Sequence, residues 1–238
     1  MLEYLELLQD KDDIALPQGV SGDFMNVKTV WKGILSWFII VMVIFALAKE
    51  WSVVAFGMTY GLGFGGIAYS LRGKVGRFFA KRGLRTYYGF LLLAVSITVS
   101  EEVYCYALGN QVAHPVLWID LIMVTVMWSV WFSTWYFFLS RRYFFEENEA
   151  LLVGGFTGVF YEFVGTGALL ENPFGIVLAV PLAVVVYAAI FVWPLQLLTF
   201  TGKQTGRMKY IVGSVFPFLL TIPVAVALYF VFAICGIQ

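Results

Sequence analysis

Long apolar stretches alternate with short polar ones from residue 31 to the end of the chain. Each stretch is close to the ~20 residues that an α-helix needs to cross the hydrocarbon core of a bilayer. We therefore predict an all-α, polytopic membrane helix bundle that covers residues 31–238. Its seven transmembrane helices are expected at about 31–49, 51–71, 87–109, 115–139, 149–170, 173–198 and 210–236.

Residues 1–30 lack an uninterrupted apolar core and are rich in acidic residues. The apolar residues at positions 1, 2, 5 and 8 favour a short amphipathic helix, which Asp10 to Asp13 and Pro17 would end. We expect this segment to be a cytoplasmic arm and not a secretory signal peptide.

The basic residues orient the predicted helices. With seven spans and the N-terminus inside, all of the 15 Lys and Arg residues except Lys49 lie in or beside the inner connecting segments. Positive residues concentrate on the cytoplasmic side of membrane proteins. We therefore expect the N-terminus inside and the C-terminus outside.

Composition agrees with a membrane protein. The chain is 61% hydrophobic and 13% charged, with a mean hydropathy of +0.86, which is outside the range of soluble domains. Its formal net charge is zero, so no overall field attracts nucleic acid. We expect a multi-pass protein of a prokaryotic cytoplasmic membrane, in contact with lipid and not with nucleic acid.

Four acidic residues fall inside the predicted spans, where each ionisable group costs ~2.5–3.5 kcal/mol on insertion scales and usually has a task. At ~1.5 Å per residue, all four lie at a similar depth in the outer half of the membrane. We find no intramembrane acid or base in the inner half, and this asymmetry favours a pocket over a path across the bilayer. The candidate catalytic residues are Glu101, Glu102, Asp120 and Glu162.

Carboxylates held close together at low dielectric cannot all ionise. At least one would keep its proton and could lose it only to a substrate. In the structural alternative, Glu101 or Glu102 only bonds to a Ser or Thr of a partner helix, and Asp120 only touches water at the interface.

Aromatic residues accompany these acids. Tyr106 lies one helical turn beyond Glu102, and at ~100° per residue Trp131 falls within ~20° of Asp120 on the helix surface. Packing and lipid contact are the alternative for any single ring. The candidate substrate-binding residues are Tyr104, Tyr106, Trp128, Trp131 and Tyr161.

The second span carries Gly57, Gly61 and Gly65 one turn apart, which is a doubled small-xxx-small motif. Such a face lets another helix backbone approach closely. We expect packing within the chain, or a homo- or hetero-oligomer formed through this face.

Metal and phosphate chemistry lack the residues that they need. The chain has one histidine, His114, and no Cys partner for it at the same depth, so a zinc or di-iron site cannot be built. No phosphate-binding glycine loop is present. We therefore expect no metal and no cofactor.

Two parts of the chain resemble known families. Glu101-Glu102-Val-Tyr-Cys-Tyr106 and Trp118-Ile-Asp120 resemble motifs of small integral-membrane isoprenoid cyclases, both the lycopene-cyclase type and the meroterpenoid terpene cyclases. Glu162-Phe-Val-Gly-Thr-Gly167 with Pro173-Phe-Gly175 is similar to a pattern of membrane carotenoid hydratases, with inserted residues. Ser100 stands where the cyclases usually have Pro.

The resemblance implies that Glu101 and Glu102 donate a proton to an alkene or epoxide of an isoprenoid or carotenoid. Asp120 or Glu162 would then remove a proton or orient water, and Trp131 would stabilise the carbocation through its π face. Two rival functions use the same features. One is a transporter or channel whose ligands are these acids, and the other is a non-catalytic subunit of a larger membrane complex.

Overall fold

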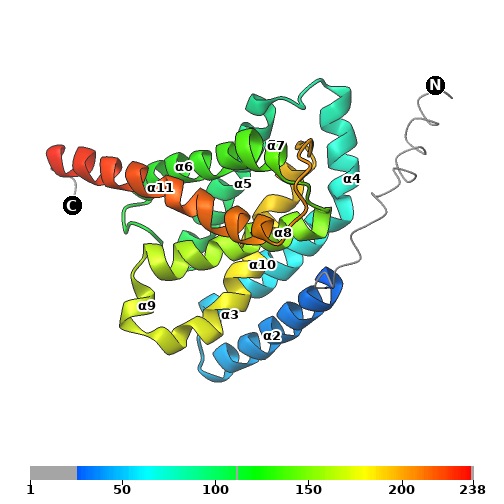
Figure 1. Ribbon diagram of the computed structural model, residues 1–238. Coiled ribbons are helices and arrows are strands. Elements are labelled where there is room, and N and C mark those ends of the chain that lie inside the picture. Colours follow the sequence, from blue (N-terminus) through cyan, green and yellow to red (C-terminus); the bar gives the residue numbers. More distant parts are fainter. Residues whose placement is uncertain (1–25, 111, 237–238) are drawn as a thin grey trace, which may run out of the picture.

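The computed structural model describes residues 26–110 and 112–236, so most of the predicted arm 1–30 lies outside the described residues. The described chain is helical and contains no strand beyond one bridge between Tyr143 and Gln204 (Figure 1). Its elements are α2 (Val27–Leu47), α3 (Trp51–Phe56), η1 (Gly57–Phe64), α4 (Gly65–Lys81), α5 (Tyr87–Ala107), α6 (Leu117–Thr134), η2 (Trp135–Leu139), α7 (Ser140–Arg142), α8 (Glu147–Val159), η3 (Phe160–Gly165), α9 (Ala168–Glu171), η4 (Pro173–Gly175), α10 (Ile176–Leu195) and α11 (Met208–Ile234).

Contiguous elements of the described chain join into long helical segments, and each predicted range overlaps one of them. Six of these segments are long and apolar enough to cross a membrane, which indicates an integral membrane protein. They are Val27–Leu47, Trp51–Lys81, Tyr87–Ala107, Leu117–Arg142, Pro173–Leu195 and Met208–Ile234. The segment formed by α8 and η3 is not among the six. It carries Glu147, Glu149 and Glu162, which lower its hydropathy.

Local capping sets where the helices begin. α2 begins at Val27, before the predicted start at 31, because the Asn26 side chain accepts hydrogen bonds from the backbone N–H groups of Lys28 and Thr29. Such a cap satisfies donors that the first helical turn leaves unpaired. Thr86 caps α5 in the same way, through the backbone N–H of Gly89.

α10 is the central helix of the bundle. It contacts α8, α4, α2, η1 and α5, and side chains such as Val184 and Phe191 are fully buried. Glycines allow this close packing. A Cβ on Gly61 would lie 3.2 Å from Val185, and a Cβ on Gly65 would lie 3.0 Å from Ala189. The glycine face of the second segment therefore packs against α10 within the chain.

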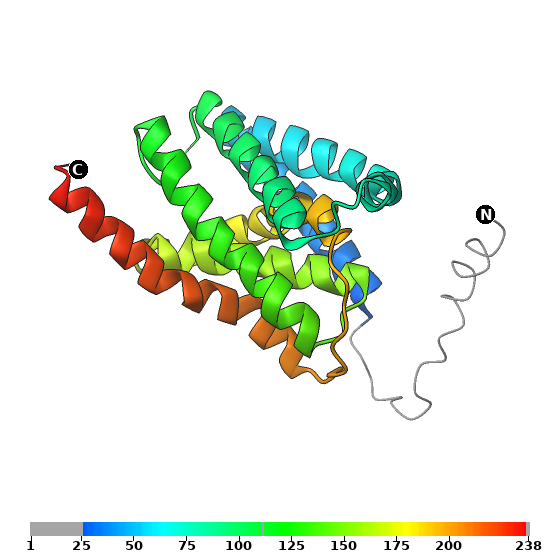
Figure 2. The same cartoon turned by 90° about the horizontal axis from the view of Figure 1, so that it is seen from above.

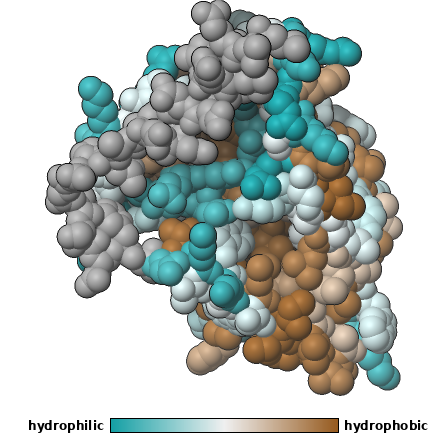
Figure 3. All heavy atoms as spheres, turned by 90° about the vertical axis from the view of Figure 1, so that its right-hand side faces the viewer, coloured by the Kyte–Doolittle hydropathy of each residue, from teal (hydrophilic) through white to brown (hydrophobic). Residues whose placement is uncertain are grey.

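Successive long segments run in opposite directions. Figure 2 shows the α4–α5 turn, the α7–α8 connection and the 196–207 loop at the same end of the bundle as the start of α2. The end of α11 lies at the opposite end. Figure 3 looks from outside at the end that carries these three connections and shows a hydrophilic area beside a hydrophobic one. The basic connecting segments thus gather at one end, which we call the basic end.

Candidate functional site

The four acids predicted inside the membrane come from three segments of the bundle. Glu101 and Glu102 lie on α5, Asp120 lies in the first turn of α6, and Glu162 lies in the π-helical stretch η3. Glu101 and Asp120 are buried, Glu102 is partly buried, and Glu162 is exposed. The group can therefore be reached from outside the protein at Glu162.

The structure places Glu101 and Glu102 within electrostatic range of Asp120 and Glu162, and we call these four residues the acid cluster. The Glu102 carboxyl lies within hydrogen-bonding reach of Asp120. Glu101 is close enough to Glu162 and Asp120 to interact with both electrostatically. Side chains far apart in the sequence thus share one site in the protein interior.

Asp120 has a structural contact and an unused oxygen. Its Oδ1 accepts a hydrogen bond of 3.0 Å from the backbone N–H of His114, which ties the α5–α6 connection to α6. Its Oδ2 is buried and has no N–H or hydroxyl donor among the described residues. The neighbouring Glu102 carboxyl could satisfy this oxygen only if a proton lies between the two groups, since an ionised carboxylate is an acceptor alone.

Tyr187 of α10 also reaches the acid cluster, and the sequence analysis did not identify it. Its hydroxyl donates a 2.8 Å hydrogen bond to Glu162 Oε1. The ring lies directly against α8, because a Cβ on Gly158 would be only 2.4 Å from it. A tyrosine in the otherwise apolar run 176–195 was the signal in the sequence.

Tyr60 is a second residue that the sequence analysis missed. Its buried hydroxyl has no hydrogen-bond partner among the described residues and lies within electrostatic range of Glu101. Its ring stacks on Phe56 and Phe64, with centroids 5.6 and 4.9 Å away. Tyr60 belongs to the π-helical stretch η1, as Glu162 belongs to η3, and π-helical turns often occur at functional sites.

Trp128 and Tyr161 lie beside the acid cluster. The Trp128 ring is 5.0 Å from that of Tyr187 and stacks on Tyr161 at 6.0 Å between centroids. Trp131 lies behind it, fully buried against Trp128 and Phe191. Of the predicted indoles, Trp128 is therefore the one that contacts the tyrosine bonded to Glu162.

The two predicted tyrosines of α5 form other hydrogen bonds. Tyr104 stacks on Tyr60 and shares a 2.7 Å hydrogen bond with Thr59, so it borders the acid cluster through its ring. Tyr106 is exposed, and its hydroxyl donates to the Pro115 carbonyl at 3.4 Å. Its hydroxyl is therefore directed to the α5–α6 connection.

An ion pair is buried near the basic end. Lys209 Nζ lies 2.6 Å from Glu149 Oε2, and both residues are buried. Lys209 also donates to the Phe144 carbonyl, and Tyr210 donates to Glu149. The sequence analysis did not identify this pair, which lies at the starts of α8 and α11. Opposite charge and several hydrogen bonds compensate the desolvation of this pair, as burial of a charge requires.

Replacing Gly158 with Ala should displace Tyr187 and weaken its hydrogen bond to Glu162. The added methyl group would lie within 2.4–2.7 Å of three ring atoms of a buried side chain, and overpacking of this kind typically costs about 1–3 kcal/mol. Thermal unfolding of the purified protein measures the loss.

Gly66→Ala is the matched control for this substitution. No atom lies within 4 Å of a Cβ at Gly66, which is also helical. Alanine has the higher helix propensity, by up to about 1 kcal/mol, so Gly66→Ala should be neutral or stabilising. Equal effects of the two substitutions would contradict the close contact between Gly158 and Tyr187.

The acid cluster lacks the arrangement of a metal site. Within the described residues, no three His, Cys, Asp or Glu side chains are arranged so that they could hold a metal ion. The acid cluster is thus a set of carboxyl groups surrounded by tyrosine and tryptophan. No family model, no curated protein and no solved structure matches this chain.

Proposed function

We propose that this protein is a membrane-embedded enzyme that protonates an alkene or epoxide of an isoprenoid or carotenoid, leading to cyclisation or hydration. The observation that carries the proposal is the acid cluster, whose four carboxyl groups come from three segments and lie beside buried tyrosine and tryptophan rings. Neighbouring carboxyl groups can share a proton and deliver it to a substrate. A substrate dissolved in the bilayer would reach them without crossing water.

The roles follow from the contacts of each acid. Glu102, paired with Asp120, is the proton donor. Glu101 lies beside this pair and returns a proton to Glu102 after each turnover. Protonation of the alkene forms a C–H bond and leaves a carbocation, which an internal alkene or a water molecule attacks. Glu162 takes up the released proton, and its oxygen is positioned by Tyr187. Trp128 offers its π face to the cation, and Trp131 packs behind it.

The experiment uses the purified protein in lipid vesicles that contain linear polyprenes or their terminal epoxides, in D₂O. Protonation of an alkene carbon from solvent-exchanged carboxyl groups should place deuterium in the polyprene product, which mass spectrometry of the lipid extract detects. An epoxide is protonated on oxygen, so its reaction is detected instead as a cyclic alcohol or a diol that chromatography separates from the substrate. Uptake of a cation by the same vesicles, without deuterium in any polyprene, would replace the proposal with transport. If the vesicles show neither activity, the protein is a non-catalytic subunit.

We also propose seven membrane spans with the N-terminus inside and the C-terminus outside, in a prokaryotic cytoplasmic membrane. In this topology α8 and η3 form the fifth span, and the basic end faces the cytoplasm. The Arg72–Glu147 and Lys209–Glu149 pairs, at 2.8 and 2.6 Å, support burial of the acids of α8 against neighbouring segments.

Labelling of Cys235 tests this topology. Cys235 is exposed at the end of α11 opposite the basic end, whereas Cys105 is buried. A membrane-impermeant maleimide added to intact cells should label the wild type but not Cys235→Ser. In Cys235→Ser/Lys203→Cys, labelling should require permeabilised cells. The reverse pattern would place the basic end outside.

A further inference from the structure

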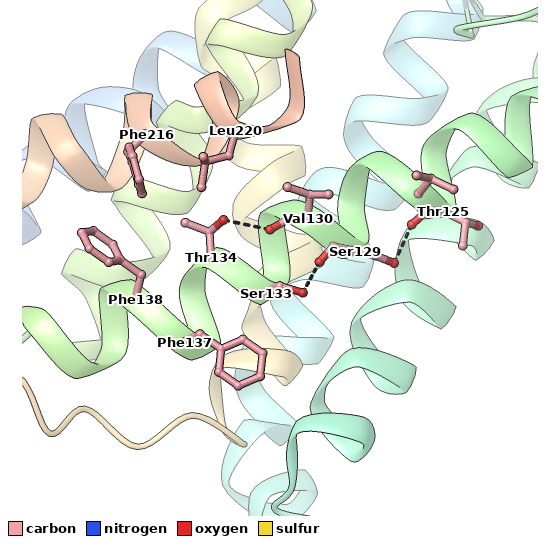
Figure 4. Close-up of a pocket in the computed structure, with 10 residues that line it drawn as sticks. Thr125, Ser129, Val130, Ser133, Thr134, Phe137, Phe138, Phe216 and Leu220 are labelled. Carbon is pink, nitrogen blue, oxygen red and sulfur yellow. Dashed lines mark hydrogen bonds between the residues drawn. The ribbon is translucent and has the colours of Figure 1, made fainter. Parts of the chain in front are cut away.

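A groove opens between α6–η2 and α11, on the side of α6 that faces away from the acid cluster. It has a volume of about 670 Å³, within the ~300–1,000 Å³ typical of ligand sites. Figure 4 shows Phe216 and Leu220 of α11 facing the hydroxyl-bearing residues of α6 across it. The lining residues include Thr125, Ser129, Ser133, Thr134, Phe137 and Phe138.

Three of the four hydroxyl groups that line this groove donate to carbonyls of their own helix. Ser129 donates to the Thr125 carbonyl at 2.7 Å, Ser133 to the Ser129 carbonyl at 2.5 Å, and Thr134 to the Val130 carbonyl at 2.9 Å. Figure 4 shows these bonds along the α6 wall. With most of its hydroxyl donors satisfied within the helix and aromatic rings at one end, the groove fits a hydrocarbon chain.

The groove is long enough for the tail of one lipid leaflet. From Thr125 to Phe138 the helix rises about 20 Å at ~1.5 Å per residue. A bilayer hydrocarbon core is ~30 Å thick, so one acyl chain extends over about half of that distance, or ~15 Å. A single lipid tail from the leaflet next to the basic end therefore fits within the groove.

Two arginines stand at the end of the groove nearest the basic end. The Arg141 guanidinium lies 5.5 Å from the Phe137 ring, and the Arg142 guanidinium lies 5.6 Å from the Phe138 ring. Both arginines are exposed, and within the described residues neither forms an ion pair. Arginine binds phosphate through a planar, bidentate fork of N–H donors.

We propose that this groove is a binding site for an anionic phospholipid. One acyl chain lies between α6–η2 and α11, and the headgroup phosphate binds Arg141 and Arg142. Arg141 and Arg142 lie at the same end of the molecule as the other basic segments. An anionic membrane surface attracts positive residues of this kind. It shares no residue with the acid cluster and does not depend on the proposed function.

The test measures the thermal unfolding midpoint of the full-length protein in detergent, with added dioleoylphosphatidylglycerol or dioleoylphosphatidylcholine. We expect the anionic lipid to raise the midpoint of the wild type by about 5 °C or more above the zwitterionic one at saturation. In Arg141→Gln/Arg142→Gln this difference should vanish. Ser129→Phe, which fills the groove, should remove the response to both lipids.

Arg77→Gln/Arg82→Gln is the matched control. Arg77 lies on α4 and Arg82 directly follows it, near the same end. Arg82 stacks on Phe78 much as Arg142 stacks on Phe138, but neither Arg77 nor Arg82 lines the groove. The control should keep the full difference between the lipids. Equal loss in both double variants, or no difference in the wild type, would show unspecific attraction to the basic end and overturn the site.

Two more outcomes would also overturn the proposal. Soluble glycerol phosphate should give no shift, because it lacks a chain, and an equal shift would reduce the site to a phosphate site. If Ser129→Phe converts a dimer into a monomer and leaves the lipid response intact, the groove is a contact between subunits. Arg141→Gln/Arg142→Gln changes only exposed side chains, so it remains informative if Ser129→Phe fails to fold.

Discussion

Replacing Glu102 with Gln should lower deuterium incorporation into the polyprene product by about 10²- to 10⁴-fold, the usual contribution of a positioned general acid. Glutamine keeps the size of the side chain and can still hydrogen-bond to Asp120, but it cannot release a proton. The loss should appear in the maximal rate more than in substrate binding, because the proton moves only in the transition state.

Glu171→Gln is the control for this prediction. Glu171 ends the short helix α9, is exposed, and contacts no member of the acid cluster. Its replacement should leave the rate within a factor of about two. The thermal midpoints of both variants should match that of the wild type. A Glu102→Gln protein that folds and turns over normally would remove Glu102 from the mechanism.

Replacing Lys209 with Met should lower the free energy of unfolding by about 3–5 kcal/mol, because it leaves the Glu149 charge buried without its partner. The lost contacts include the 2.6 Å ion pair, which joins α11 to the start of α8, and the bond to the Phe144 carbonyl in the α7–α8 connection. A reversible denaturation curve of the purified protein measures the change.

Two comparisons isolate the unpaired charge. In Lys209→Met/Glu149→Gln both charges are removed, and the double variant should be more stable than Lys209→Met alone. Arg72→Gln breaks the Arg72–Glu147 pair, whose side chains are 31% and 36% exposed, so it should cost only about 1 kcal/mol or less. A Lys209→Met protein no less stable than Arg72→Gln would contradict the burial of the charge.

The helical segments were predictable because the length of an apolar run is a local property. The predicted range 87–109 contains α5 (Tyr87–Ala107), and the range 173–198 contains the segment Pro173–Leu195. The ends were less predictable, since they depend on caps such as Asn26. The range 149–170 was the least uniform. Its helix begins at Glu147 and changes to a π-helix at Phe160.

The acid cluster was partly predictable. Rise per residue placed Glu101, Glu102, Asp120 and Glu162 at a common depth, and the structure places the first two within electrostatic range of the other two. Depth alone could not show which aromatic ring faces them. The angle between Trp131 and Asp120 on the helix surface predicted that Trp131 lies near the acids. In the structure, Trp128 is the ring that contacts Tyr187. The separation and tilt of α6 and α10 decide which tryptophan of α6 contacts that tyrosine of α10.

By itself, the sequence determined that this chain is helical, suited to a membrane and basic at one end. Those properties follow from hydropathy, charge and helical rise, which neighbouring residues establish together. Only the tertiary structure decided that Tyr187 bonds Glu162, that Lys209 is buried on Glu149, and that a groove lies between α6 and α11. These contacts depend on how helices distant in the chain rotate and approach one another, and glycines such as Gly158 set that approach through packing, which hydropathy does not encode.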